Sequence, residues 1–146
     1  MIYKNTISRM GRRCAAVACM VTAGSAIMAL PAVAGVNCTA GYHCLFFSDV
    51  NSSKHSYFDS VTNFNGDTFS GGNGNGSGWA VDNNSWAASN SSTGNRESHY
   101  YDGANYSGFL FCLNPGATVH SLPSNLKDRA SSLRLMPRTS APCLSN

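Results

Sequence analysis

Residues 101–108 read Tyr-Asp-Gly-Ala-Asn-Tyr-Ser-Gly, with two aromatic residues separated by four others and a glycine two positions after the second. This spacing predicts a folded β-hairpin over which the rings of Tyr101 and Tyr106 pack together. Gly108 is expected to take a positive φ, a conformation in which a side chain would clash. The stretch therefore predicts β structure with a tightly folded turn.

The chain repeats itself around this hairpin. A shift of 54 residues places Phe47 on Tyr101, and a shift of 45 residues places Asn83 on Asp128. The two shifts differ by nine residues, which is the length of the low-complexity tract 70–78 (SGGNGNGSG). Such a composition predicts a flexible loop. We therefore predict two similar β units, the first of which carries a nine-residue insertion.

Short runs typical of strands recur between clusters of Gly, Asn and Ser, and no window of 12 residues or more in the predicted mature chain has an apolar stripe at helical spacing. This pattern predicts an all-β sandwich or barrel. The runs are 43–47, 56–62, 79–81, 99–102, 109–113, 118–122 and 131–136.

The charges are few and unevenly placed. Only 12% of residues are charged, about half of the usual share, which argues against a helical bundle. Four of the ten Lys and Arg residues lie in the first 13 positions, so from residue 35 onward six cations face seven acidic residues. This near-neutral remainder excludes a basic nucleic-acid binder.

The first 34 residues have the order of a secretory signal peptide. A basic segment is followed by an apolar run over 14–30 and by Pro-Ala-Val-Ala at 31–34, which predicts cleavage after Ala34. A membrane anchor is the alternative, but the apolar run has only 17 residues and contains Gly24 and Ser25. We predict a secreted protein with one mature domain, 35–146, and no membrane segment in its mature form.

Four cysteines remain after the leader: Cys38, Cys44, Cys112 and Cys143. An even number in a secreted domain of this size predicts two disulfides, for which three pairings are possible. Cys38 and Cys44 bracket five residues, so a local Cys38–Cys44 bridge is natural and leaves Cys112 for Cys143. A zinc site is the alternative, but no histidine has the required spacing.

The hairpin spacing of 101–108 resembles the signature of the βγ-crystallin Greek key, although in the first unit Ser52 and Lys54 occupy the positions of the second aromatic residue and the glycine. More closely, residues 38–135 resemble secreted actinobacterial proteins of peptidase inhibitor family I36. The matching stretches are CTAGYHC at 38–44, VDNN at 81–84, NPGA at 114–117 and LKDRASSLR at 126–134. The resemblance implies a βγ-crystallin-like sandwich of two Greek-key units, stapled by disulfides.

It also implies the function of a secreted proteinase inhibitor, most naturally of a thermolysin-like metalloproteinase, with an extracellular protease as partner and a monomeric state. In this family the reactive loop is closed by a second local disulfide, whereas the matching region here has no cysteine. We predict that this region and the tract 71–78 are exposed loops. The candidate inhibitory loop consists of Ser91, Ser92, Thr93, Gly94, Asn95, Arg96, Glu97, Ser98 and His99.

Catalytic constellations are missing from the sequence, so we expect no enzyme activity. An SxxK match at 124–127 follows Pro123 in an apparent loop, whereas this motif works only where a helix presents the lysine to the serine. The alternative function is a secreted, non-enzymatic binding or antimicrobial module that uses aromatic residues near Tyr100, Tyr101, Tyr106 and Trp86.

Calcium is the second metal for which the sequence can be tested. βγ-crystallin sites use a pair of acidic or amide residues followed by hydroxyl residues. Here Lys127 occupies the first position of the second copy, and Trp86 and Ala87 replace the two hydroxyl residues of the first. We therefore expect Ser131 and Ser132 to brace the hairpin, and we expect no cofactor. Residual calcium binding by a structural extracellular domain is the alternative.

Overall fold

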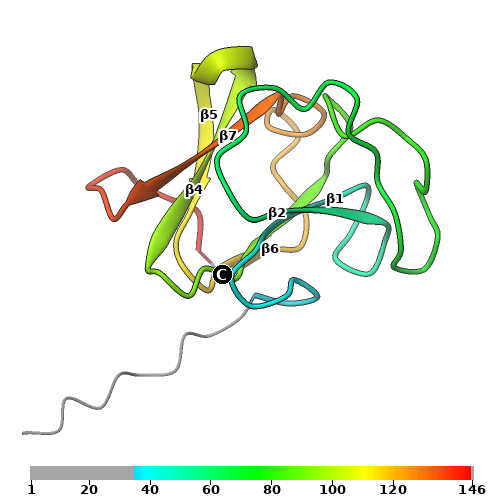
Figure 1. The fold of residues 1–146 in the computed structure, drawn as a ribbon, viewed down its shortest axis with the longest axis horizontal. Helices are drawn as coiled ribbons and strands as arrows, with labels where there is room; N and C mark the ends of the chain where they lie inside the picture. Colours follow the sequence, from blue (N-terminus) through cyan, green and yellow to red (C-terminus); the bar gives the residue numbers. More distant parts are fainter. Residues whose placement is uncertain (1–34, 146) are drawn as a thin grey trace, which may run out of the picture.

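Seven strands form two antiparallel sheets in the computed structural model, which describes residues 35–145 (Figure 1). A short 3₁₀ turn, η1 (Ala104–Tyr106), joins β4 to β5. This part of the chain contains no helix that could cross a membrane, and the predicted signal peptide lies outside it. The strands are β1 (His43–Phe46), β2 (Lys54–Tyr57), β3 (Ala87–Asn90), β4 (Arg96–Gly103), β5 (Ser107–Leu113), β6 (Thr118–Val119) and β7 (Ser132–Pro137).

Each sheet contains a strand segment that comes from the other sequence unit. One sheet has the order β2-β1-β3-β6 and the other the order β5-β4-β7. By sequence β6 belongs to the second unit, yet it pairs with β3 of the first. In return Val61 of the first unit pairs with Leu133 in β7, through hydrogen bonds of 2.7 and 2.9 Å. The result is two interlocked Greek-key units, as the internal repeat predicts.

The core lies between the sheets and draws large side chains from both units. Tyr100 stacks on Phe111 at 4.8 Å between ring centroids, and Tyr57 stacks on Phe64 at the same distance. Full burial of each such side chain stabilises the fold by roughly 1.5–3 kcal/mol. Other buried members are Leu45, Phe69, Val81, Leu113, Leu122 and Leu133.

The β4–β5 hairpin folds as its sequence predicts. The ring centroids of Tyr101 and Tyr106 lie 5.8 Å apart, and Gly108 has a φ of +67°. The hydroxyl of Ser132 donates a hydrogen bond of 2.7 Å to the carbonyl of Gly103. This bond is the bracing role expected of the serines at 131–132.

The β1–β2 hairpin closes by different means because it lacks the second aromatic residue. Ser52 Oγ accepts hydrogen bonds from the backbone N–H groups of Ser48 and Asp49 at 3.0 and 3.3 Å. Phe47, the counterpart of Tyr101, is covered by Trp79, whose ring centroid lies 5.3 Å away. Trp79, the residue directly after the insertion, thus supplies the aromatic cover that the hairpin itself lacks.

The glycine-rich tract 70–78 is fastened to this hairpin. The N–H of Ser53 donates to the carbonyl of Asn75, and the N–H of Asn73 donates to that of Asn51, at 3.0 and 2.9 Å. These bonds argue against the flexible loop that its composition predicts. The tract is exposed, as predicted, except for the half-buried Gly76.

One predicted strand is absent from the structure, and one observed strand was not predicted. Residues 79–81 form only an isolated bridge, in which Ala80 pairs with Thr68. The third strand of the β2-β1-β3-β6 sheet is instead β3, which reads Ala-Ala-Ser-Asn and is fully buried. Its small side chains carry no intrinsic β preference, and it forms because β1 and β6 pair with its two edges.

The disulfides pair as predicted, Cys38 with Cys44 and Cys112 with Cys143. The first spans 6 positions of the sequence and the second 31. The second fixes the C-terminal segment to β5, where Leu144 also pairs with Leu113. Two disulfides point to an oxidising compartment.

Removal of the longer bridge should cost more stability than removal of the shorter one. Loop-closure entropy predicts losses of about 4 kcal/mol for Cys112→Ser/Cys143→Ser and about 2 kcal/mol for Cys38→Ser/Cys44→Ser. Urea unfolding of both double variants measures the difference. The reverse order would show that the C-terminal segment contributes little to the folded state.

Gly76→Ala should destabilise the first hairpin, because an added Cβ would lie 2.1 Å from the ring of Phe47. Gly74→Ala is the matched control: its φ of +86° is close to the +84° of Gly76, but no atom lies within 4 Å of its Cβ. We expect a loss of about 1 kcal/mol for the control, and at least 1 kcal/mol more for Gly76→Ala. Equal losses in thermal or urea unfolding would contradict the packing of Phe47 on the tract.

Candidate functional site

The predicted inhibitory loop proves to be much shorter than nine residues. Only Thr93, Gly94, Asn95 and Arg96 are exposed, and Arg96 already begins β4. The prediction of an exposed loop is therefore wrong at the remaining five positions, which are buried: Ser91, Ser92, Glu97, Ser98 and His99. Their polar side chains suggested a loop, but in the fold they find hydrogen-bond partners inside the protein. We call residues 93–96 the β3–β4 turn.

Asn90 holds both ends of the β3–β4 turn. Its Oδ1 accepts a hydrogen bond of 2.9 Å from the N–H of Ser92, and its Nδ2 donates one of 2.9 Å to the carbonyl of Arg96. Ser92 Oγ in turn accepts a bond of 3.0 Å from the N–H of Arg96. Because Asn90 is fully buried, water does not compete for these bonds. The turn is therefore held in one conformation.

The short disulfide loop at 38–44 supports the same turn. Ser91 Oγ donates a hydrogen bond of 2.8 Å to the carbonyl of Cys38. The N–H of Gly41 donates to the carbonyl of Ser91, and the N–H of Ser91 donates to that of Tyr42, at 2.7 and 2.9 Å. The Cys38–Cys44 bridge thus stiffens the base from which the turn projects.

A pocket of about 310 Å³ lies beside the turn and is lined by Phe58, Thr93, Arg96 and His43 among others. His43 Nδ1 lies 2.6 Å from Ser98 Oγ. Burial, assisted by the positive charge of Arg96, lowers the pKa of His43 to about 4. The imidazole is therefore neutral at pH 7. Ser98 is fully buried, so the His43–Ser98 pair is closed to a substrate. The absence of enzyme activity remains a prediction.

Glu97, supported by His99, binds the C-terminal segment to β4. His99 Nε2 lies 2.8 Å from Glu97 Oε2, and Thr139 donates to Glu97 through its backbone N–H and its hydroxyl at 2.9 and 2.7 Å. Burial by itself raises the pKa of Glu97, but the hydrogen bonds from His99 and Thr139 outweigh it and hold the pKa below its usual value. These two predicted site residues therefore have structural partners.

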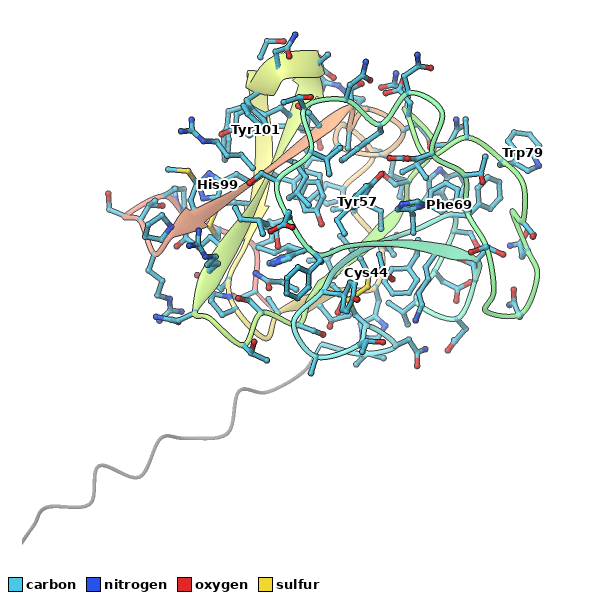
Figure 2. The ribbon with its side chains drawn as sticks, in the orientation of Figure 1. Cys44, Tyr57, Phe69, Trp79, His99 and Tyr101 are labelled. Carbon is cyan, nitrogen blue, oxygen red and sulfur yellow. A yellow bond between two sulfur atoms is a disulfide. The ribbon has the colours of Figure 1, made fainter. Side chains whose placement is uncertain are left out.

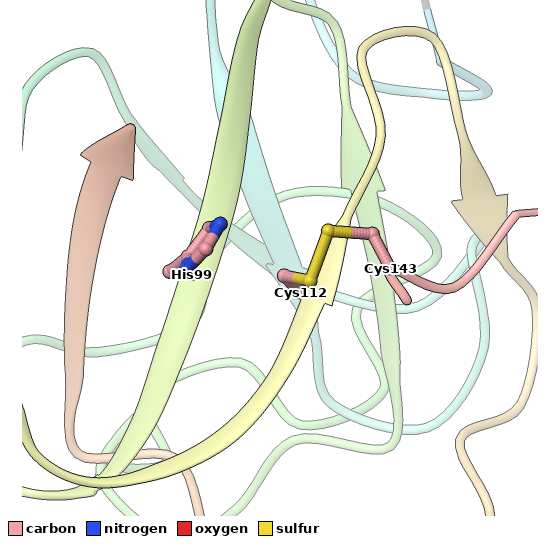
Figure 3. Close-up of side chains that lie close together, drawn as sticks. All are labelled: His99, Cys112 and Cys143. Atoms are coloured by element: carbon pink, nitrogen blue, oxygen red, sulfur yellow. A yellow bond between two sulfur atoms is a disulfide. The ribbon is translucent and has the colours of Figure 1, made fainter. Parts of the chain in front are cut away.

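His99 also lies near the second disulfide (Figure 3). Ligand atoms of His99, Cys112 and Cys143 fall within 4.8 Å of one another. The two sulfurs are bonded to each other, so neither offers the thiolate that a metal ion would require. In the oxidised protein this group is a disulfide beside a histidine.

The calcium motifs pair across the two units. Ser131 Oγ lies 3.3 Å from Asn83 Oδ1, which joins the hydroxyl of the second copy to the amide of the first. In the reciprocal pair Trp86 occupies the hydroxyl position, and its Nε1 donates to both oxygens of Asp128 at 2.9 and 2.8 Å. The indole N–H of Trp86 therefore already pairs with the carboxylate of Asp128. The expectation of no cofactor remains a prediction.

A second concave region, which the sequence did not reveal, contains both tryptophans of the chain. Trp79 and Trp86 line a cleft of about 220 Å³ together with Phe47, Ser48, Asn84 and Asp128. We call these six residues the tryptophan cleft. Of these residues the sequence singles out only Trp86 as a surface aromatic; Trp79 begins the run 79–81 that the sequence predicts as a strand, and no sequence signal joins the two.

The architecture matches that of a solved structure described as concerning the evolution of the eye lens βγ-crystallin domain fold. The match has a TM-score of 0.54 and 14% identity, and it covers 70% of this chain and 92% of that one. The protein therefore has a βγ-crystallin-like fold, and at this identity the likeness shows the fold alone.

No family model matches the chain, and no curated protein matches it. The resemblance to the I36 inhibitors therefore stays a prediction.

Stability should fall with acidity through His43. The pKa of His43 in the folded protein, about 4, lies below the ordinary histidine pKa of 6.5, so on acidification the unfolded chain takes up the proton first. The free energy of unfolding should drop by about 2 kcal/mol from pH 7 to pH 5. Urea unfolding of His43→Asn should lack this drop, whereas the exposed His120→Asn is the control. An unchanged slope in His43→Asn would contradict the assignment.

Proposed function

We propose that the protein is a secreted proteinase inhibitor of the I36 type, with a metalloproteinase as its target class. The β3–β4 turn would enter the protease cleft, in an interface of about 800 Å² per partner. The inhibitor would act as a monomer on an extracellular protease and would carry out no catalysis itself.

The bracing of the β3–β4 turn by Asn90 is the observation that carries this proposal. A loop ordered before binding loses little conformational entropy in the complex, and this is how rigid inhibitors gain affinity. The turn lies where the reactive loop of the resembled family falls. The buried Asn90 and the Cys38–Cys44 loop supply the rigidity that a second local disulfide supplies in that family.

The alternative is a secreted, non-enzymatic binding or antimicrobial module on the same scaffold. Exposed aromatic side chains favour it: Trp79 is 59% exposed and Trp86 is 43% exposed. Tyr100, which the sequence placed near such a surface, is fully buried in the core and offers nothing to a partner. Tyr101 and Tyr106 are half-buried.

Arg96→Ala should weaken inhibition at least tenfold, because Arg96 is the one charged side chain of the turn. Residues 35–146 are titrated against a thermolysin-like and a subtilisin-like protease, with peptide hydrolysis as the measurement. Arg134→Ala, which removes an exposed arginine on β7, is the matched control and should inhibit like the wild type. Full activity of both proteases at about 1 μM protein would refute the proposal for these classes.

A further inference from the structure

Both tryptophans of the chain, Trp79 and Trp86, line the tryptophan cleft. Trp79 projects from the edge of the molecule away from His99 (Figure 2). Large apolar side chains that remain exposed together, around a concave surface, mark a binding site more often than chance exposure does. The cleft is not part of the inhibitory turn, since Trp86 precedes β3 and the turn follows it.

One wall of the cleft is held in place before any ligand arrives. The ring of Phe47 lies between Trp79 and the buried Phe69, with centroid distances of 5.3 and 5.9 Å. Beneath it Gly76 leaves no room for a Cβ. Phe47 and Trp79 are tilted by 55° to each other, and together they present a fixed aromatic surface.

The other wall is Trp86, whose polar edge is already satisfied. Its Nε1 donates to Asp128, and Lys127 Nζ lies 4.4 Å from its ring centroid. Lys127 does not line the cleft, so its ammonium covers the ring from outside. Trp86 therefore offers the cleft a ring surface and no hydrogen-bond donor.

The polar groups of the cleft are mainly acceptors. Asp128 has lone pairs left beyond its bonds to Trp86. Asn84 uses its Nδ2 to donate to the carbonyl of Asp82 at 2.8 Å, which leaves its Oδ1 available. Ser48 Oγ is engaged with Asn75 and Asp49. A matching ligand has an apolar face for the rings and several hydroxyl donors around its edge.

The charge of the site favours a neutral ligand. An aromatic site with a carboxylate also suits a quaternary ammonium ion, but Lys127 lies next to Trp86 and opposes the charge of Asp128. The volume of about 220 Å³ is below that of sites for drug-sized molecules, and it suits one ring of a larger chain. Sugars combine these features, because their axial C–H groups form an apolar face and their hydroxyls form the rim.

We propose that the tryptophan cleft is a saccharide-binding site that takes one ring of a neutral oligosaccharide. The ring lies against Trp79 and Trp86 and donates hydroxyl hydrogen bonds to Asp128 and Asn84. This binding does not depend on protease inhibition, and it gives the alternative binding function a ligand class.

Intrinsic tryptophan fluorescence tests the proposal directly, because both fluorophores line the cleft. Residues 35–146 are titrated with triacetylchitotriose, cellotriose and maltotriose, and separately with tetramethylammonium chloride. We expect a saturable change with at least one sugar, with a Kd of about 1 mM or below. No saturable change with any of the three, or saturation by tetramethylammonium alone, overturns the proposal.

Variants distinguish the cleft from the rest of the surface. Trp79→Ala should weaken sugar binding at least tenfold, whereas Phe58→Ala, which removes a side chain that is 61% exposed elsewhere, should not change it. Asp128→Asn, which keeps the size of the side chain, should weaken binding several-fold. Unchanged binding by both Trp79→Ala and Asp128→Asn would place the sugar elsewhere and overturn the proposal.

The two proposals fail separately. Arg96→Ala should bind sugar like the wild type, and Trp79→Ala should inhibit proteases like the wild type if inhibition is present. A protein that binds sugar without inhibiting either protease would refute the inhibitor proposal and leave the cleft proposal standing.

Discussion

The exchange of strand segments between the two units is the constraint on which the rest of the structure depends. β6 completes the sheet of the first unit, and the segment around Val61 completes that of the second by pairing with Leu133. Since neither unit retains all of its own strands, neither can bury its apolar face alone. The two sheets, and the surfaces that they form, can therefore fold only together.

Within this shared frame the two hairpins have diverged. Tyr106 covers Tyr101 in the second unit, whereas Trp79, which follows the insertion, covers Phe47 in the first. Tyr106 stays half-buried, but Trp79 remains largely open to solvent. The substitute cover thus repairs a packing defect and at the same time forms one wall of the tryptophan cleft. One residue, Trp79, therefore both completes the packing of the first hairpin and contributes to a candidate binding surface.

Features that rest on local chemistry could be predicted from the sequence. The aromatic pair and Gly108 determine the second hairpin within eight residues, and the short spacing of Cys38 and Cys44 favours the observed one of the three possible disulfide pairings. Features that rest on distant partners could not be. Ser91 and Ser98 can be buried because partners far away in the sequence pair with them, the carbonyl of Cys38 with Ser91 and Nδ1 of His43 with Ser98. The tryptophan cleft likewise joins residues from 47 to 128 that only the strand exchange brings together.

The position of Cys143, 31 residues after Cys112, has a consequence for the order of assembly. Cys38 and Cys44 can be oxidised early, since they need only a short stretch of chain. Cys143 reaches Cys112 only after the segment between them, which carries β6 and β7, has been synthesised. The second bridge can therefore form only once all seven strands have been synthesised, and it then prevents the C-terminal segment from separating from β5.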